Sequence, residues 1–165
     1  MEMEGLSSDA VRQFVLFTLG EEEYGLPVER VTSIIRYEDP TPVPHAPEYI
    51  EGVINLRGRI VPVIDLRRRL YGVQVDRSHG ARVIVTETSA GLVGFAVESA
   101  HEVARIPSQA VMEPPQSVSA SDLAEAFEGV ADHEGRLVIL LIPDNLVPST
   151  SFVATDELEG ASVDV

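Results

Sequence analysis

The feature that most constrains this chain is an internal repeat. The segment from Gly25 to Arg36 matches the segment from Gly94 to Arg105 at a constant offset of 69 residues, with Gly, Val, Glu and Arg at equivalent places. A second block, residues 51–61, recurs at residues 128–138 with an offset of 77, so the second copy carries eight additional residues in a loop. Two copies are too few for a solenoid. Because both blocks keep their register, the repeat predicts a duplication, in which two similar small barrels are related by a pseudo-two-fold axis.

Short apolar segments rich in Val and Ile, separated by Gly-containing turns, predict an all-β chain. The clearest strands are residues 13–19, 24–28, 52–56, 60–66, 82–86, 92–97 and 137–142. Hairpin turns are predicted at residues 20–23, 57–58, 89–91 and 133–135. Only short helices are expected, at residues 47–50, 66–71, 121–127 and 143–146.

The repeat also sets the expected domain boundaries. The first barrel repeat covers residues 12–72 and the second covers residues 81–148, joined by a linker at residues 73–80. An N-terminal tail, residues 1–11, and an acidic flexible tail, residues 149–165, flank them. A unit of about 70 residues is small for an independent core. We therefore expect the halves to pack on one another, with strand exchange as one arrangement.

The composition narrows the range of partners. The formal net charge is −15, every basic residue is Arg, and aromatic residues make up only 5%. Nucleic acid and anionic membrane surfaces are poor partners for such a chain, because both require clustered positive charge. No apolar run is long enough to span a bilayer, and the N-terminal residues are acidic, unlike a signal peptide. These features predict a soluble cytoplasmic protein.

The chain offers no recognisable catalytic or metal-binding motif. It contains no Cys, which excludes disulfides and thiol chemistry. A phosphate-binding glycine loop and a Gly-x-Ser-x-Gly elbow are both absent, and the four histidines are scattered without metal-ligand spacing. We therefore expect no enzymatic activity, no metal and no cofactor.

The arginines are unevenly distributed. Seven of the twelve lie from Arg57 to Arg82, where only Asp65 and Asp76 oppose them. This cluster is either a solvated surface or an electropositive patch that steers an acidic protein partner. Arg57 lies at the tip of a predicted hairpin, where the second copy has Glu134. A planar guanidinium suits the anchoring of an interface, so a specific function and plain surface charge are both open for Arg57.

One continuous stretch carries a familiar pattern. Residues 47–67 read Pro-Glu-Tyr-Ile-Glu-Gly-Val-Ile-Asn-Leu-Arg-Gly-Arg-Ile-Val-Pro-Val-Ile-Asp-Leu-Arg, and residues 17–25 read Phe-Thr-Leu-Gly-Glu-Glu-Glu-Tyr-Gly. In these segments, and over residues 12–148 as a whole, the chain resembles the chemotaxis coupling family, CheW. The resemblance implies two SH3-like or OB-like five-stranded β-barrels with a few short helices, in agreement with the duplication.

The resemblance further implies a non-enzymatic adaptor that joins chemoreceptors to the CheA histidine kinase. Its partners would be the cytoplasmic helical tip of methyl-accepting chemoreceptors and the regulatory domain of CheA. The adaptor would be recruited from the cytoplasm to receptor arrays without inserting into the membrane. In the family, the receptor tip lies in an apolar groove between the barrels. Carried over by position, the receptor-binding residues are Val31, Ile34, Arg57, Ala100 and Val103.

One position departs from the family pattern. Ser33 stands where the family commonly has an acid that could pair with the hairpin arginine. Arg57 is then expected either to pair with Glu29 or Glu38 or to meet the receptor unpaired. Two alternative functions remain: a related adaptor of a pilus or developmental pathway, and a small-molecule-binding barrel that uses the seam between the halves as its pocket.

Overall fold

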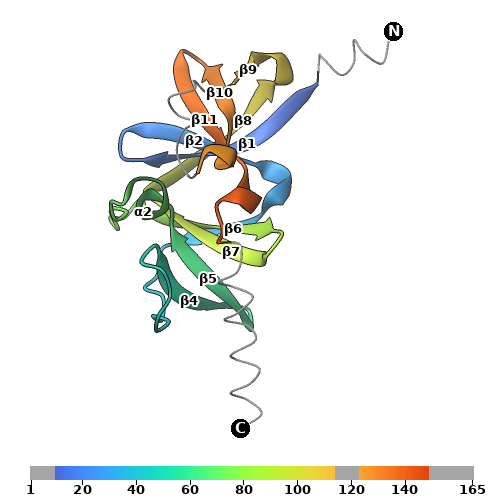
Figure 1. The fold of residues 1–165 in the computed structure, drawn as a ribbon. Coiled ribbons are helices and arrows are strands. Elements are labelled where there is room, and N and C mark those ends of the chain that lie inside the picture. Colours follow the sequence, from blue (N-terminus) through green and yellow to red (C-terminus); the bar gives the residue numbers. More distant parts are fainter. Residues whose placement is uncertain (1–9, 114–122, 149–165) are drawn as a thin grey trace.

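A computed structural model describes residues 10–113 and 123–148 of the chain. Within these residues the chain forms two β-sheets with one short α-helix (Figure 1). The six-stranded sheet has the order β8 (Ser99–Pro107), β1 (Val11–Leu19), β2 (Glu22–Pro27), β11 (Arg136–Leu141), β10 (Phe127–His133), β9 (Val111–Met112). The five-stranded sheet has the order β3 (Val31–Arg36), β6 (Arg82–Thr88), β7 (Gly91–Val97), β5 (Arg59–Asp65), β4 (Ile50–Leu56). The prediction of an all-β fold with few short helices is confirmed.

Each sheet contains strands from both halves of the chain. β1 and β2 lie in one sheet with β8, β10 and β11, whereas β3, β4 and β5 lie in the other sheet with β6 and β7. The chain crosses between the sheets after β2, through the 3-10 turn Val28–Arg30, and again from β7 into β8. The order β8-β1-β2-β11-β10 becomes β3-β6-β7-β5-β4 when each strand is replaced by its counterpart in the other copy. The repeats at residues 12–72 and 81–148 are therefore units of sequence, and neither of them alone makes up a sheet.

The predicted hairpin turns are present, and two of them share one geometry. Arg57-Gly58 joins β4 to β5, and Glu134-Gly135 joins β10 to β11. All four residues have positive φ, between 54° and 85°, which is the signature of a two-residue type I′ turn. The side chains of Asn55 and Asp132 accept hydrogen bonds from the glycine N–H groups, at 2.8 and 3.0 Å.

The helix predictions are confirmed in part. α2 (Leu66–Tyr71) is capped by the carboxylate of Asp65, which accepts from the Arg68 N–H at 3.0 Å, and it ends at Gly72 with a φ of 75°. Two other predicted helices contain the 3-10 turns Ala124–Ala126 and Pro143–Asn145. The prediction of a helix at residues 47–50 is wrong, because this proline-containing segment forms turns that lead into β4.

The tails fall largely outside the described residues. This applies to all of the predicted acidic tail, residues 149–165, to residues 1–9 of the predicted N-terminal tail, and to residues 121–122 of a predicted helix. β1 already begins at Val11, within the predicted N-terminal tail. No helix in residues 10–113 or 123–148 is long and apolar enough to cross a membrane.

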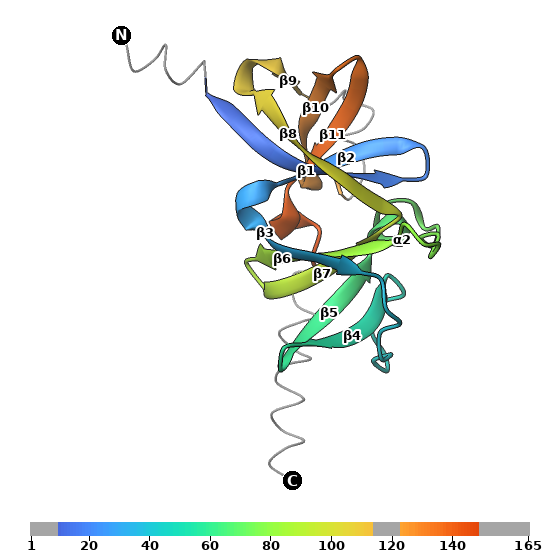
Figure 2. The same cartoon turned by 180° about the vertical axis from the view of Figure 1, so that it is seen from behind.

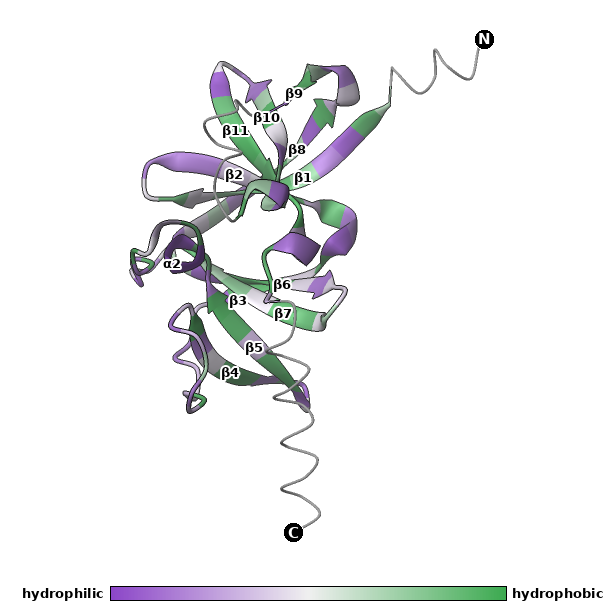
Figure 3. Ribbon diagram, viewed as in Figure 1, coloured by the Kyte–Doolittle hydropathy of each residue, from purple (hydrophilic) through white to green (hydrophobic). Residues whose placement is uncertain are grey.

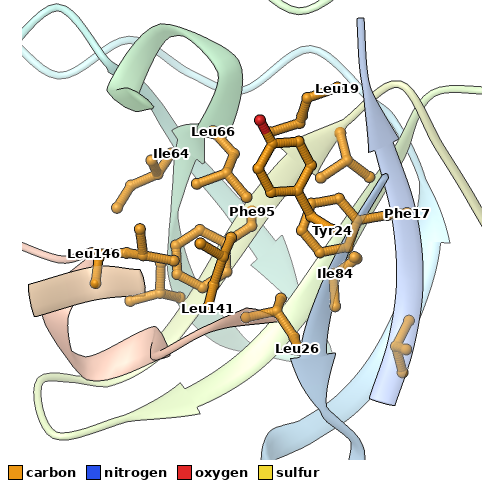
Figure 4. Close-up of a cluster of buried hydrophobic side chains, with 14 of the residues drawn as sticks. Phe17, Leu19, Tyr24, Leu26, Ile64, Leu66, Ile84, Phe95, Leu141 and Leu146 are labelled. Atoms are coloured by element: carbon orange, nitrogen blue, oxygen red, sulfur yellow. The ribbon is translucent and has the colours of Figure 1, made fainter. Parts of the chain in front are cut away.

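The largest buried cluster lies between the sheets and takes side chains from both (Figure 4). Phe17 and Tyr24 stack at 5.8 Å between ring centroids on the side of the six-stranded sheet, and Ile84 and Phe95 come from the five-stranded sheet. All four are fully buried, and burying each such side chain contributes about 1.5–3 kcal/mol. The interior of the seam is therefore filled by the protein's own side chains, and this shared core holds the two sheets together.

Candidate partner-binding face

β3 and β8 are equivalent strands in the two copies of the repeat, and each is an edge strand of its sheet. Figure 2 shows both strands on the near side of the molecule, with β8 crossing the boundary between the sheets. β8 also contacts β6, the neighbour of β3. Four of the five residues expected to bind a receptor lie on these two strands.

The structure separates these four residues into two pairs. Val31 and Ala100 are half-buried and pack against the central cluster, so they belong to the seam. Ile34 and Val103 are exposed, at 42% and 52% of their surface. Because the seam interior is filled, a partner can bind only at its surface, where Ile34 and Val103 offer apolar contacts.

Two further residues on this side of the molecule were missed in the sequence analysis. Side chains two positions apart on a strand share a face, so Arg36 lies beside Ile34 and Arg105 beside Val103. Both arginines are exposed, and neither forms an ion pair with a residue in the described ranges. The recurrence of Arg as the last residue of both copies of the repeated segment was the signal that could have identified them. We refer to Ile34, Arg36, Val103 and Arg105 as the β3–β8 face.

Arg57, the fifth expected residue, lies apart from this face. The β4–β5 hairpin points away from the six-stranded sheet in both views (Figures 1 and 2). Arg57 is exposed at its tip with a φ of 54°, a conformation that costs a non-glycine residue about 1–2 kcal/mol. Among the residues that the structure describes, neither Glu29, Glu38 nor any other acid pairs with it.

At the corresponding end of the six-stranded sheet, the arginine is paired with acids. Arg136, the repeat counterpart of Arg59, lies 3.5 Å from Glu102, the counterpart of Ser33. Arg136 also donates to Glu23 at 2.8 Å, and His133 lies 3.1 Å from Glu102. The hydrogen bond with His133, together with the charge of Arg136, lowers the pKa of Glu102. A serine at position 33 offers no carboxylate, so the guanidiniums of the β4–β5 hairpin keep their charge available for a partner.

The arginine cluster around α2 is not a free positive patch, although Figure 3 shows α2 as strongly hydrophilic. Its members have partners within the protein. These are Glu98 for Arg67 (2.8 Å), Glu48 for Arg68 (3.5 Å), the ring of Tyr49 for Arg69, Glu51 for Arg77 (3.2 Å) and the His79 carbonyl for Arg82 (3.0 Å). Of the seven arginines, only Arg57 and Arg59 lack a partner in the described part of the chain, which favours a solvated surface over a steering patch around α2.

The described residues also show no arrangement that suits a metal. Residues 10–113 and 123–148 contain no group of three or more His, Asp or Glu side chains that could hold a metal ion. The features of the β3–β8 face are apolar exposure and positive charge, which are properties of a binding surface.

Comparison with known proteins identifies the family. The model of the CheW-like domain matches residues 13–151. The chemotaxis protein CheW of Thermotoga maritima is 33% identical over 143 residues, which cover 85% of this chain and 91% of that protein. The CheW of Rhizobium meliloti is 31% identical over 139 residues, covering 84% and 88%, and protein FrzA of Myxococcus xanthus is 31% identical over 125 residues, covering 76% and 77%.

A solved structure agrees with these relatives. The crystal structure of the scaffolding protein TtCheW from Thermoanaerobacter tengcongensis has a TM-score of 0.77 and 33% sequence identity, and the match covers 86% of this chain and 90% of that one. Together these findings support a chemotaxis adaptor with two SH3-like barrels. The chain belongs to the CheW-like family.

Proposed function

We propose that this protein is a non-enzymatic adaptor of the cytoplasm that couples the helical tip of a methyl-accepting chemoreceptor to the regulatory domain of the CheA kinase. The observation that carries the proposal is the exposure of Ile34 and Val103 at repeat-equivalent positions on β3 and β8. An arginine two residues further along each strand gives the same face a positive charge in a protein with a net charge of −15. Such a face suits a helix with an apolar stripe flanked by acids.

The size of the face sets the expected affinity. Ile34 and Val103 are about half exposed, so their full burial would contribute about 1 kcal/mol each, less than half the value for a fully exposed side chain. Two arginine–carboxylate contacts at the rim add a similar amount and depend on salt. These contributions sum to about 4 kcal/mol, which is equivalent to about millimolar affinity, so a single receptor contact should be weak and the multivalent array should supply avidity.

Arg57 forms a second contact in this proposal. Its guanidinium has no acid within the described residues, and its backbone is held in a strained conformation at the hairpin tip. Strained, exposed residues with unused charge are typical of functional positions. We expect an acidic group of the partner to pair with it.

The kinase would bind elsewhere on the protein. Ile60 on β5 and Leu137 on β11 occupy equivalent positions beside the two hairpin tips and are 55% and 64% exposed. The hairpins lie at opposite ends of the molecule (Figure 1). Two separate apolar ends allow different neighbours to bind, and heterologous contacts of this kind can close into rings.

Reconstitution with a receptor signalling fragment and CheA tests the proposal. Kinase autophosphorylation should respond to the receptor fragment only when this protein is present. A chain with Ile34→Asp and Val103→Asp should lose that response, whereas Val73→Asp, at a linker residue that is 48% exposed, should retain it. Receptor control of the kinase that does not depend on this protein would refute the adaptor function.

A further inference from the structure

The chain crosses between the two sheets at two places, and an ion pair is present at each crossing. Glu98 lies at the crossing from β7 into β8, and it pairs with Arg67 of α2 at 2.8 Å. Arg30 lies at the crossing from β2 into β3, and it pairs with Asp144 of the 3-10 turn that follows β11. We refer to the pair of Glu98 and Arg67 as the β8 clamp and to the pair of Arg30 and Asp144 as the β3 clamp.

The acid of each clamp also accepts a hydrogen bond from a hairpin turn. Glu98 accepts from the Gly20 N–H in the β1–β2 turn, and Asp144 accepts from the Ser89 N–H in the β6–β7 turn, the latter at 2.9 Å. In the β8 clamp, α2 follows a strand of the five-stranded sheet, whereas the β1–β2 turn belongs to the six-stranded sheet. In the β3 clamp the two sheets exchange these roles. Each clamp therefore joins both sheets at the point where the chain crosses between them.

The two clamps occupy equivalent places in the repeat, but they are built from residues that do not correspond. Asp144 is the repeat counterpart of Arg67 and has the opposite charge. The acid therefore lies at the crossing in the β8 clamp and on the helical turn in the β3 clamp, whereas an unchanged duplicate would carry the same charges at both places. The side chains of Arg30 and Asp144 are 32% and 36% exposed, and ion pairs at such exposure contribute little to stability. Positioning of the crossing accounts for the β3 clamp better than stability does.

The clamps lie between the surfaces that the proposed function assigns to the two partners. β3 begins directly after Arg30 and β8 directly after Glu98, and these strands carry the β3–β8 face. On the other side of each pair, α2 follows β5 and the turn with Asp144 follows β11. β5 and β11 bear Ile60 and Leu137, the exposed residues at the two hairpin ends. Because coupling between distant sites is carried by rigid elements and the contacts that join them, each clamp connects one strand of the face with one hairpin end.

We propose that the β3 and β8 clamps are positioning contacts that transmit receptor binding at the β3–β8 face to the hairpin ends where the kinase binds. The inference rests on the proposed adaptor function and adds the residues that connect its two surfaces. The clamp residues themselves touch neither partner. A receptor that displaces β3 or β8 would move the clamp residue at the start of that strand, and the ion pair would pass the displacement to the helical turn at the end of β11 or β5.

Separate measurements of partner affinity and of kinase control test this inference. Arg30→Gln and Arg67→Gln each remove one ion pair. In either variant the affinities for a receptor signalling fragment and for CheA should stay within about twofold of the wild type, while the receptor-dependent change in kinase autophosphorylation should fall by about threefold or more. Arg30→Lys and Arg67→Lys keep the positive charge, so they should retain most of the receptor control.

Arg12→Gln is the matched control, because it removes an ion pair of similar exposure that joins two strands of a single sheet. Arg12 on β1 and Glu128 on β10 are 34% and 28% exposed, and both strands belong to the six-stranded sheet. This variant should retain both affinities and full receptor control, and the unfolding midpoint of each variant checks its integrity.

The outcomes separate this inference from the adaptor function. Receptor control at the wild-type level in both Arg30→Gln and Arg67→Gln would overturn the inference and leave the adaptor function intact. A loss of control that is fully explained by weaker partner binding would overturn it equally. Absence of receptor control with the wild-type protein would refute the adaptor function, and the inference with it.

Discussion

Glu98 should contribute strongly to the stability of this protein. Its side chain is 11% exposed and joins three segments that are distant in sequence. The carboxylate accepts from Arg67 Nη1 on α2 at 2.8 Å, from the Asp76 N–H in the linker at 2.8 Å, and from the Gly20 N–H in the β1–β2 turn. Glu98→Ala removes all three contacts at once.

The expected cost follows from these contacts. A hydrogen bond to a charged group contributes about 1.5–3 kcal/mol, but the two backbone donors lie near the surface and regain water when the carboxylate is removed. We therefore expect Glu98→Ala to lower the free energy of unfolding by about 2–3 kcal/mol, and the Tm by roughly 4–12 °C. Urea and thermal unfolding followed by circular dichroism measure both quantities.

The repeat supplies the control for this experiment. Glu29 is the counterpart of Glu98 in the first copy, is exposed, and has no partner within the described residues. Glu29→Ala should change the free energy of unfolding by less than about 0.5 kcal/mol, as is usual for such surface sites. Equal effects of the two substitutions would refute the assignment of Glu98 as a link between segments.

Three further predictions concern other positions. Arg57→Asn should stabilise the fold by about 1 kcal/mol, because Asn tolerates positive φ, and it should weaken receptor binding. Glu134→Asn should stabilise the fold equally without affecting receptor binding. Unfolding curves and receptor titrations of the two variants measure these effects. The folded-state pKa of Glu51 is raised above the ordinary glutamate pKa of 4.5. As the pH rises above 4.5, the wild type should therefore lose stability relative to Glu51→Gln, by about 1.4 kcal/mol per unit of difference between the folded and unfolded pKa. A pH series of unfolding curves with no such trend would contradict this prediction. Gly52→Ala should prevent folding, because a Cβ there would lie 2.1 Å from a backbone carbonyl oxygen. Position 58 has open space around it, so Gly58→Ala should lower the free energy of unfolding by only about 1 kcal/mol. Soluble yield and the unfolding midpoint measure the two effects.

The parts of the fold that depend on local chemistry could be predicted from the sequence. The Gly residues at positions 58 and 135 indicated the two hairpin tips, because positive φ at a two-residue turn strongly favours glycine. The repeat correctly indicated two equivalent β units. β3, β8 and β10 were not among the clearest predicted strands, because Ser, Thr, His and Glu interrupt their apolar pattern. β3 and β8 are edge strands, so each has a hydrogen-bonded neighbour on one side only.

The parts that depend on topology could not be predicted. The alternation of residues along a strand is the same whether the strand pairs within its own repeat or with the other copy, so strand exchange was only one possible arrangement. The location of Arg57 at the outer end of one sheet, away from the filled seam, follows from the same topology. Glu51 is a similar case: it reads as an ordinary surface acid in the sequence, and it becomes buried only because Tyr37 and the linker residue Arg77 pack over it.

The most direct test of the central claim, that the β3–β8 face binds a receptor, is the affinity of a receptor signalling fragment for the protein without the kinase. Substituting Ile34→Asp and Val103→Asp together should weaken this affinity more than tenfold, and Arg36→Glu with Arg105→Glu should weaken it and reduce its salt dependence. Val73→Asp should bind like the wild type. Wild-type affinity in both double variants, with their folding intact, would show that the receptor binds elsewhere.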